Sequence, residues 1–427
     1  MAREPQVLMF GWEFPPVISG GLGVACLGLC KALAPFAKLR MVIPKSVPNF
    51  SIPNIELVGL NSFTAEQLRE MFRQDQWVDV SSLHYVAGGV HPYMRIGSDE
   101  FINEKFYEVF FEEVKPFDLD ALYAGDVIRK VMEFARISVQ YAMQQDFDVI
   151  HSHDWMTFLP GMILKQKTGK PLVLHVHSLE YDRAGEGSRN WVYELERRAM
   201  QLADRVIPVS RYTGSVCEKY YGIDPAKITP VHNGVEFVQR TVKKSPMKEK
   251  LVIFFGRITM QKGPEYFVEA ARVVLAHHPD VKFVMAGSGD LYTPLIEKIA
   301  DYRMGDKFYF TGFLNKKMLN ELLAVADVYC MPSVSEPFGL SAVEAVQYGI
   351  PVIMSKTSGA GEVLNSALKI DFWDTHKMAQ YIIACLDYPG IRHAVVDQAN
   401  EDLKSITWEN TAKKVMKVYE ELLVNSF

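Results

Sequence analysis

The feature that most constrains the fold is a series of short apolar runs, each followed by a turn and then by a helical pattern. Runs that are apolar throughout are typical of strands buried on both faces, as in a parallel sheet covered by helices. The runs are QVLMFG, DVIHSH, LVLHVHS, RVIPVS, ITPVHNG, LVIFFG, VKFVMAG, KFYFTG, DVYCMPS and IPVIMS. We therefore predict an α/β fold built from doubly wound parallel sheets.

The number of runs and the length of the chain both indicate more than one domain. A chain of 427 residues is too long for one ordinary core. The polar stretch QRTVKKSPMKEK at 239–250 separates the runs into two groups and is typical of an inter-domain linker. We predict Rossmann-like domains over 1–240 and 241–404, and an amphipathic helix over 405–427 that packs back on the first domain. A single (β/α)8 barrel is the rival architecture, which the linker disfavours.

Charge and cysteine spacing narrow the range of partners. The formal net charge of −5 gives no support for nucleic acid or an anionic membrane surface. The five cysteines form no CxxC pair, so we interpret them as reduced core residues rather than as disulfides or zinc ligands. No stretch reaches the roughly 18 apolar residues of a membrane span, and the first apolar run is too short for a signal segment. We expect a cytoplasmic protein with no integral membrane segment.

Candidate ligand-binding residues lie just after the apolar runs, because open parallel sheets bind ligands at the carboxyl ends of their strands. After the first run, Gly20 and Gly21 open a helix, where bare backbone N–H groups suit a phosphate. The same glycines are compatible with a simple strand-to-helix turn. A dinucleotide site is disfavoured because the GxGxxG pattern with a later acidic residue is missing.

Histidines end two neighbouring runs, in HSHDW (151–155) and in HVHS (175–178). Together with Asp154 they are as compatible with a binding cleft as with a structural role. A zinc site needs three convergent ligands, often with HExxH spacing, which is absent. The Asp-x-Asp triplets at 118–120 and 146–148 do not clearly follow strands, so surface or capping roles are favoured. We therefore predict no metal site.

Two cations follow the first run of the second group, in LVIFFGRITMQKG. Arg257, with its planar fork, and Lys262, a point charge, suit a diphosphate beside a helix start, although exposed cations are also often merely solvated. Gly287 in MAGSGD and Phe313 in FTGFL belong to glycine-rich turns at the same sheet edge. Backbone contacts in these turns are suited to a nucleotide base.

The stretch SVSEPFGLSAVEAVQYG places Glu336 and Glu344 on either side of a turn. A helix starting near Gly339 leaves the N–H groups of Phe338, Gly339 and Leu340 as unpaired donors beside Glu336. Donors and a carboxylate together match sugar hydroxyls, and Glu344, about one and a half turns along, suits a ribose diol. The structural alternative is a helix cap at Glu336 and a solvent-facing Glu344. We interpret the pair as contacts for a nucleotide sugar.

With these motifs, the chain resembles the GT-B retaining glycosyltransferases, which include glycogen, starch and sucrose synthases. Glu336-x7-Glu344 is similar to the Glu-x7-Glu motif of that group. GRITMQKG is similar to its Arg/Lys diphosphate clamp, GGLG to its first-loop glycines, and PVHNGVE to the segment leading into its second domain. The closing WENTAKKVMKVYEELL resembles its crossover C-terminal helix. MFGWEFPPVISGGLG and HSHDW resemble the glycogen/starch-synthase-like branch, although Ile18 stands where glycogen synthases usually carry a lysine.

The resemblance implies two facing domains, an N-terminal one on the acceptor side and a C-terminal one that binds a nucleotide sugar. It implies transfer of a hexosyl unit, with glucose expected, from UDP- or ADP-glucose to a glycan such as glycogen, with retention of configuration. Arg257 and Lys262 would stabilise the diphosphate, and His177 and Glu336 would contact the donor sugar near the reacting centre. Asp154 is expected in the cleft, and no cofactor or metal is expected.

Three alternatives remain open on the same fold. The acceptor would be a cell-surface glycan, a lipid or a small molecule in the first alternative. The second is a sugar-nucleotide epimerase, and the third is a catalytically silent sugar-nucleotide-binding protein.

Overall fold

The computed structural model describes residues 4–17, 20–73, 109, 117, 126–237 and 248–424. Ile18, Asp118, Asp120 and most of the expected linker lie outside the described residues. The chain forms two compact units. Unit 1 contains Met1–Val209, Thr213–Gly234 and Trp408–Phe427, and unit 2 contains Ser210–Tyr212 and Val235–Thr407. The division into an acceptor-side and a donor-side domain stays a prediction.

Unit 1 is built on a six-stranded parallel sheet of order β3-β2-β1-β4-β5-β6, which is the order of a doubly wound Rossmann-like sheet. Its strands are β1 (Gln6–Phe10), β2 (Lys38–Ile43), β3 (Ile55–Gly59), β4 (Val149–His153), β5 (Leu172–Val176) and β6 (Arg205–Pro208). Its described helices are α1 (Gly21–Leu33), α2 (Ala65–Arg73), α5 (Val127–Ala142), α6 (Trp155–Thr168), α7 (Glu180–Ala184), α8 (Trp191–Leu202), α9 (Arg211–Tyr221, which starts in unit 2) and α16 (Trp408–Val424).

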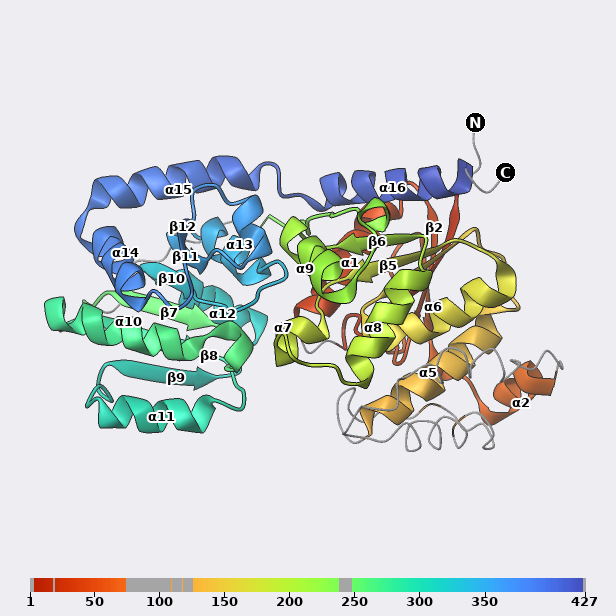
Figure 1. The fold of residues 1–427 in the computed structure, drawn as a ribbon, viewed down its shortest axis with the longest axis horizontal. Helices are drawn as coiled ribbons and strands as arrows, with labels where there is room; N and C mark the ends of the chain where they lie inside the picture. Colours follow the sequence, from red (N-terminus) through yellow and green to blue (C-terminus); the bar gives the residue numbers. More distant parts are fainter. Residues whose placement is uncertain are drawn as a thin grey trace. The chain divides into compact units, whose positions relative to one another are not determined.

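Unit 2 repeats this winding in a second six-stranded parallel sheet, of order β12-β11-β10-β7-β8-β9 (Figure 1). Its strands are β7 (Leu251–Phe255), β8 (Lys282–Ala286), β9 (Phe308–Gly312), β10 (Val328–Met331), β11 (Val352–Ser355) and β12 (Leu368–Ile370). Its helices are α10 (Pro264–His277), α11 (Tyr292–Asp301), α12 (Lys316–Leu323), α13 (Leu340–Gln347), α14 (Thr375–Asp387) and α15 (Pro389–Leu403). Two open sheets confirm the predicted fold class and exclude a single barrel.

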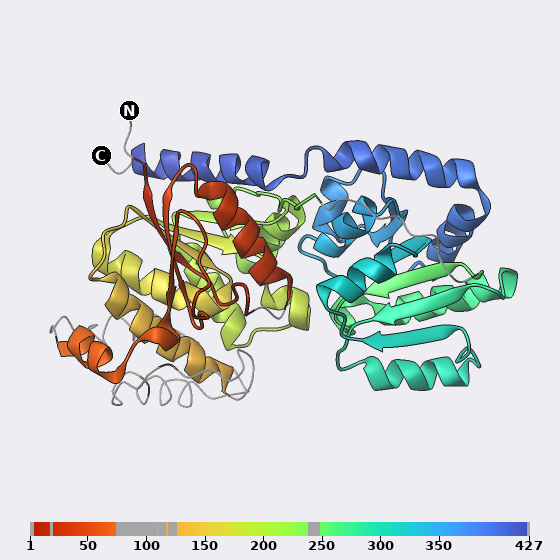
Figure 2. The ribbon, with the colours of Figure 1, turned by 180° about the vertical axis from the view of Figure 1, so that it is seen from behind.

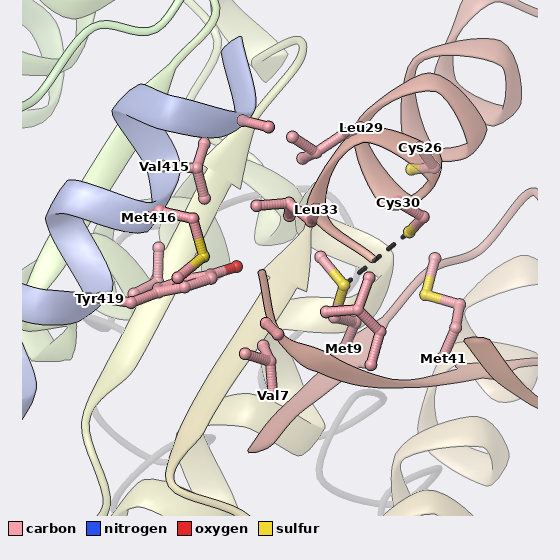
Figure 3. Close-up of a cluster of buried hydrophobic side chains, with 14 of the residues drawn as sticks. Val7, Met9, Cys26, Leu29, Cys30, Leu33, Met41, Val415, Met416 and Tyr419 are labelled. Atoms are coloured by element: carbon pink, nitrogen blue, oxygen red, sulfur yellow. Dashed lines mark hydrogen bonds between the residues drawn. The ribbon is translucent and has the colours of Figure 1, made fainter. Parts of the chain in front are cut away.

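The C-terminal helix α16 returns to unit 1 and packs with α1 on one face of its sheet (Figure 2). Figure 3 shows apolar side chains of both helices meeting above those of β1 and β2. Gly28 of α1 allows the close approach, because a Cβ there would lie 2.2 Å from Cε2 of Trp408. The predicted C-terminal helix that packs back on the first domain is therefore confirmed, and its described bounds are Trp408 and Val424, where 405–427 was predicted.

The predicted strand ITPVHNG is wrong. Ile228 makes an isolated parallel bridge to Val206 of β6, and the N–H groups of Thr229 and Val231 donate to the backbone oxygens of Val206 and Pro208 at 2.9 Å each. Pro208 has no N–H to donate in return, so the ladder is not completed. Conversely, β2, β3 and β12 were not predicted, since KLRMVI, IELVG and LKI are short and mix charged with apolar residues. Among the described residues, no helix combines the length and the hydropathy that a membrane crossing requires.

Candidate active site

The loops after β7 and β10 meet at the carboxyl ends of these two central strands of the unit 2 sheet. These strands are neighbours in the sheet, although β8 and β9 lie between them in sequence. The chain adds β8 and β9 on one side of β7 and β10, β11 and β12 on the other, so the strand order reverses between β7 and β10. Ligands of doubly wound sheets bind at such a switch point, outside the carboxyl ends of the strands. Arg257 and Lys262 follow β7 and Glu336 follows β10, so the topology brings the predicted clamp and the first glutamate together.

Lys262 and Glu336 form an ion pair between the loop after β7 and the loop after β10. Lys262 Nζ lies 2.5 Å from Glu336 Oε2, and their side chains are 18% and 8% exposed. Ser333 Oγ donates to the same carboxylate oxygen at 3.1 Å. An ion pair this buried has a stronger interaction than an exposed one because water screens it less. The lysine ammonium is thereby held in one position at the switch point.

Arg257 is held by a residue that the sequence analysis did not identify. Its Nη2 donates to Gln261 Oε1 at 3.0 Å, and Gln261 Nε2 donates to the backbone oxygen of Ser335 at 3.1 Å. Val334 N–H in turn donates to the Gln261 backbone oxygen at 2.9 Å. The buried Gln261 thus links the loop after β7 to the loop after β10. In the sequence, the only indication of this link is an amide side chain that lies between the two cations.

Helix α13 begins beside Glu336, as predicted, but Glu336 does not cap it. The N-cap is Gly339, with φ 102°, which has no side chain to cap the first turn. The left-handed backbone and a Met331 Cε atom 2.9 Å from a would-be Cβ both favour glycine here. Phe338 is buried, and its backbone oxygen accepts from Ser358 Oγ at 3.1 Å. The α13 N-terminus, beginning at Leu340, therefore keeps its N–H donors free of side-chain caps.

Glu344 is not a simple solvent-facing carboxylate, because its Oε1 lies 2.5 Å from Nζ of the exposed Lys316. Phe313, after β9, is 75% exposed. Gly287, after β8, has φ 141°, and a Cβ there would lie 1.8 Å from the Gly256 backbone oxygen. Only glycine fits so close to the β7 loop. The donor-binding roles of these three residues stay predictions.

In unit 1, Asp154 binds the loop that carries His177. The Asp154 carboxylate accepts hydrogen bonds from His177 N–H at 2.7 Å and from Ser178 N–H at 3.2 Å. Asp154 has φ 60° and ψ 169°, a backbone conformation that residues other than glycine rarely adopt and that is therefore strained. Its burial and its backbone partners indicate that Asp154 positions this loop. The sequence analysis had predicted only that Asp154 lies in the cleft.

Burial sets the protonation of both residues. It raises the pKa of Asp154 to about 7, although the two backbone N–H donors partly oppose the shift. Burial lowers the pKa of His177 to about 3, so the imidazole is neutral at neutral pH. His177 is half-buried, and its Nε2 lies 3.0 Å from His153 Nδ1. A neutral imidazole in this position can exchange hydrogen bonds with sugar hydroxyls without carrying charge.

The start of α1 holds a carboxylate that the sequence analysis overlooked. Glu13, which is 3% exposed, accepts a hydrogen bond from Gly20 N–H at 3.1 Å. Gly21, the first residue of the helix, is exposed. A carboxylate at this helix N-terminus repels a phosphate, which makes the loop less suited to the donor diphosphate than the sequence suggested.

A buried ion-pair network supports the loop after β5. Arg183 donates to Glu196 at 2.7 Å, to Glu180 at 2.9 Å and to Ser178 Oγ at 2.9 Å. Burial raises the pKa of Glu196 to about 7, while Arg183 opposes that shift. The only sequence signal for this network is the charged EYDR run that follows the strand.

The second Asp-x-Asp triplet has a structural role in part. Asp148 Oδ2 accepts a hydrogen bond from Gln6 N–H at 2.9 Å and so fastens the start of β1.

The comparisons with known proteins agree with this geometry. Residues 236–418 match the family model of the glycosyl transferases group 1, and residues 104–238 match that of glycosyltransferase family 4. D-inositol 3-phosphate glycosyltransferase of Acidothermus cellulolyticus is 30% identical over 65% of this chain and 68% of its own length. Glycogen synthase of Mycobacterium tuberculosis is 26% identical over 97% of this chain and 94% of its own length.

Among solved structures, the catalytic domain of starch synthase IV from Arabidopsis thaliana, bound to ADP and acarbose, superposes with a TM-score of 0.69. It is 15% identical and covers 99% of this chain and 100% of its own. The chain therefore belongs to the GT-B glycosyltransferases, and it is a transferase enzyme.

Proposed function

We propose that the protein is a retaining glycosyltransferase that moves a glucosyl unit from UDP- or ADP-glucose to an α-glucan such as glycogen. The observation that carries the proposal is the Lys262–Glu336 ion pair beside Arg257 at the switch point of the unit 2 sheet. Two fixed cations beside an uncapped helix N-terminus are suited to a nucleoside diphosphate, which is the leaving group of such a donor.

In this proposal the cations act on the leaving group. Negative charge builds on the diphosphate as the bond to the sugar breaks, and Arg257 and Lys262 stabilise that charge in place of a metal ion. Lys262 is already oriented by Glu336, so little reorganisation is needed when charge develops. Glu336 then serves both as the partner of Lys262 and as an acceptor for a sugar hydroxyl.

The remaining roles follow from the same assignment. The neutral His177, positioned by Asp154, contacts the donor sugar near its reacting carbon. Glu344 accepts from the ribose diol, and Phe313 and Gly287 lie near the base. No cofactor takes part.

The full-length similarity to a glycogen synthase supports an α-glucan acceptor. A second candidate acceptor is a phosphorylated cyclitol, which the 30% identical relative named as a D-inositol 3-phosphate glycosyltransferase favours. The matching families are transferases, which disfavours a sugar-nucleotide epimerase and a catalytically silent binding protein.

The test is a donor and acceptor panel. The protein is incubated with radiolabelled UDP-, ADP- and GDP-glucose, each with glycogen, with D-inositol 3-phosphate or with no acceptor. Label in glycogen from a UDP or ADP donor supports the proposal. Label only in the cyclitol product supports the second candidate, and no acceptor-dependent transfer from any donor contradicts both.

A further inference from the structure

Four imidazole rings gather on one face of the unit 1 sheet. His151 and His153 alternate along β4, and His175 and His177 lie at the end of β5 with the same spacing, with His153 directly opposite His175. His151, His153 and His175 are fully buried on the face of the sheet that α1 and α16 cover. His177 is the predicted contact for the donor sugar, whereas the three inner histidines have no part in the proposed transfer.

The inner rings carry hydrogen-bonding atoms that nothing in the described chain satisfies. The Nε2 atoms of His151 and His153 and both ring nitrogens of His175 are buried without a partner among the described residues. Each buried polar atom left unpaired costs about 1–3 kcal/mol. Four such atoms in one cluster favour a bound group that pairs with them.

The same atoms have the composition and spacing of a metal site. One ring nitrogen from each of His151, His153 and His175 lies within 4.8 Å of the other two. The Cys26 thiol of α1 forms a second such group with His153 and His177, also within 4.8 Å. We propose that His151, His153 and His175 bind one transition-metal cation, with Zn²⁺ as the preferred ion and the neighbouring Cys26 as the fourth ligand, its thiol releasing a proton to solvent when the ion binds.

The partners of the other ring nitrogens fit this assignment. His151 Nδ1 lies 2.5 Å from the Tyr419 hydroxyl, and His153 Nδ1 lies 3.0 Å from His177 Nε2. Metal-binding histidines commonly use one nitrogen for the ion and the other for an orienting hydrogen bond. In both residues the nitrogen left without a partner is the one available to the ion. Figure 3 shows Cys26 and Tyr419 on the two helices that cover this face.

The chemistry of the ligands selects the ion. Neutral imidazole and thiolate suit Zn²⁺, which has no d-electron preference and accepts irregular tetrahedral sites. The rings are now nearly parallel, 3° apart for His151 and His175 and 16° apart for His151 and His153. Their in-plane lone pairs do not converge in this arrangement, so we expect loading to turn chiefly the ring of His175, whose two nitrogens have no partner among the described residues, while His151 keeps its hydrogen bond to Tyr419. The ion is structural, and it fixes the His153 ring that contacts His177.

The test measures metal content and not transferase activity, so it is independent of the proposed function. Wild-type protein is stripped with a chelator, reloaded with Zn²⁺ or Co²⁺, desalted and analysed by elemental mass spectrometry and visible absorption. We expect about one ion per chain, an intense four-coordinate Co²⁺ spectrum and a higher melting temperature with Zn²⁺. His175→Gln should lose all three, whereas the exposed control His393→Gln should keep them.

Two results overturn the proposal. One is a wild-type chain that retains no ion after loading, which leaves buried water as the partner of the ring nitrogens. The other is equal metal content in wild type and His175→Gln. If His175→Gln does not fold, Tyr419→Phe replaces it, since it keeps every ligand but removes the hydroxyl beside His151. Its Zn²⁺ affinity should fall by about 10- to 100-fold, and an unchanged affinity rejects the assignment.

Discussion

The ion pair between Lys262 and Glu336 allows a sharp test of the site, through the substitution Glu336→Gln. The amide keeps the shape of the side chain but removes its charge. Lys262 then loses the carboxylate 2.5 Å from its ammonium, while Ser333 can still donate to the amide oxygen. The perturbation therefore acts on the orientation and charge environment of the ammonium, and it leaves the backbone of the loop in place.

The size of the effect follows from burial. With exposed fractions of 18% and 8%, the pair is poorly screened, and a hydrogen bond to a charged group contributes about 1.5–3 kcal/mol. If that energy is used where charge develops on the diphosphate, kcat falls by about 10- to 100-fold. Donor affinity should change much less, because the ground-state diphosphate still meets both cations.

Glu344→Gln is the contrasting variant. Its partner Lys316 is 60% exposed, so the loss of that pair costs about 0–1 kcal/mol of stability. If Glu344 binds the ribose, donor binding weakens by about 1–3 kcal/mol and kcat stays close to wild type. The exposed Glu321 on α12 supplies a matched control, and Glu321→Gln should alter neither quantity.

The assay combines steady-state kinetics with calorimetric titration of the donor and melting temperatures for all three variants. The reasoning predicts a kcat effect in Glu336→Gln and an affinity effect in Glu344→Gln. Unchanged kcat and unchanged donor affinity in both variants would refute it. The two glutamates would then serve only the packing of the α13 start.

The other predictions concern the clamp, metal dependence and the unit 1 fold. Arg257→Ala or Lys262→Ala should lower turnover by about 100-fold, and near-normal turnover in both excludes the clamp. Transfer should continue in excess EDTA without added Mg²⁺ or Mn²⁺; a loss that either ion restores, and Zn²⁺ does not, contradicts this. Gly28→Ala should destabilise the protein by about 1–3 kcal/mol in thermal melts, because Trp408 must shift, and an unchanged melting temperature contradicts the packing. The raised pKa of Glu196 means that its stabilising contribution is complete below about 4.5 and is lost as the pH rises through about 7. The melting temperature of Glu196→Gln relative to wild type should therefore rise over that range, and a constant difference argues against the shift.

The sequence predicted the architecture because buried parallel strands leave continuous apolar runs. It missed β2 and β3, in which Lys38, Arg40 and Glu56 interrupt the pattern near the sheet edge. It predicted a strand at ITPVHNG because the apolar composition of that segment does not show that Pro208, in the neighbouring strand β6, lacks the N–H that would complete the ladder.

Sequence reasoning predicted the candidate site residues but not the partners that hold them. The start of α13 at Gly339 could be predicted because a glycine turn and a helical pattern adjoin. The pairing of Lys262 with Glu336 spans 74 residues and depends on the strand order. The search for HExxH spacing likewise could not show that the three inner histidines lie close together, because the register of two strands, and not helix spacing, brings them together.

The most direct test of the central claim compares a nucleoside diphosphate with its nucleoside. UDP and uridine, and ADP and adenosine, are titrated into wild type, Lys262→Met and the exposed control Lys317→Met. If Arg257 and Lys262 hold the diphosphate, one of the diphosphates should bind wild type and the control at least about 100-fold more tightly than its nucleoside. That preference should largely disappear in Lys262→Met. Equal binding of nucleoside and diphosphate, or a preference that survives in Lys262→Met, would contradict the account.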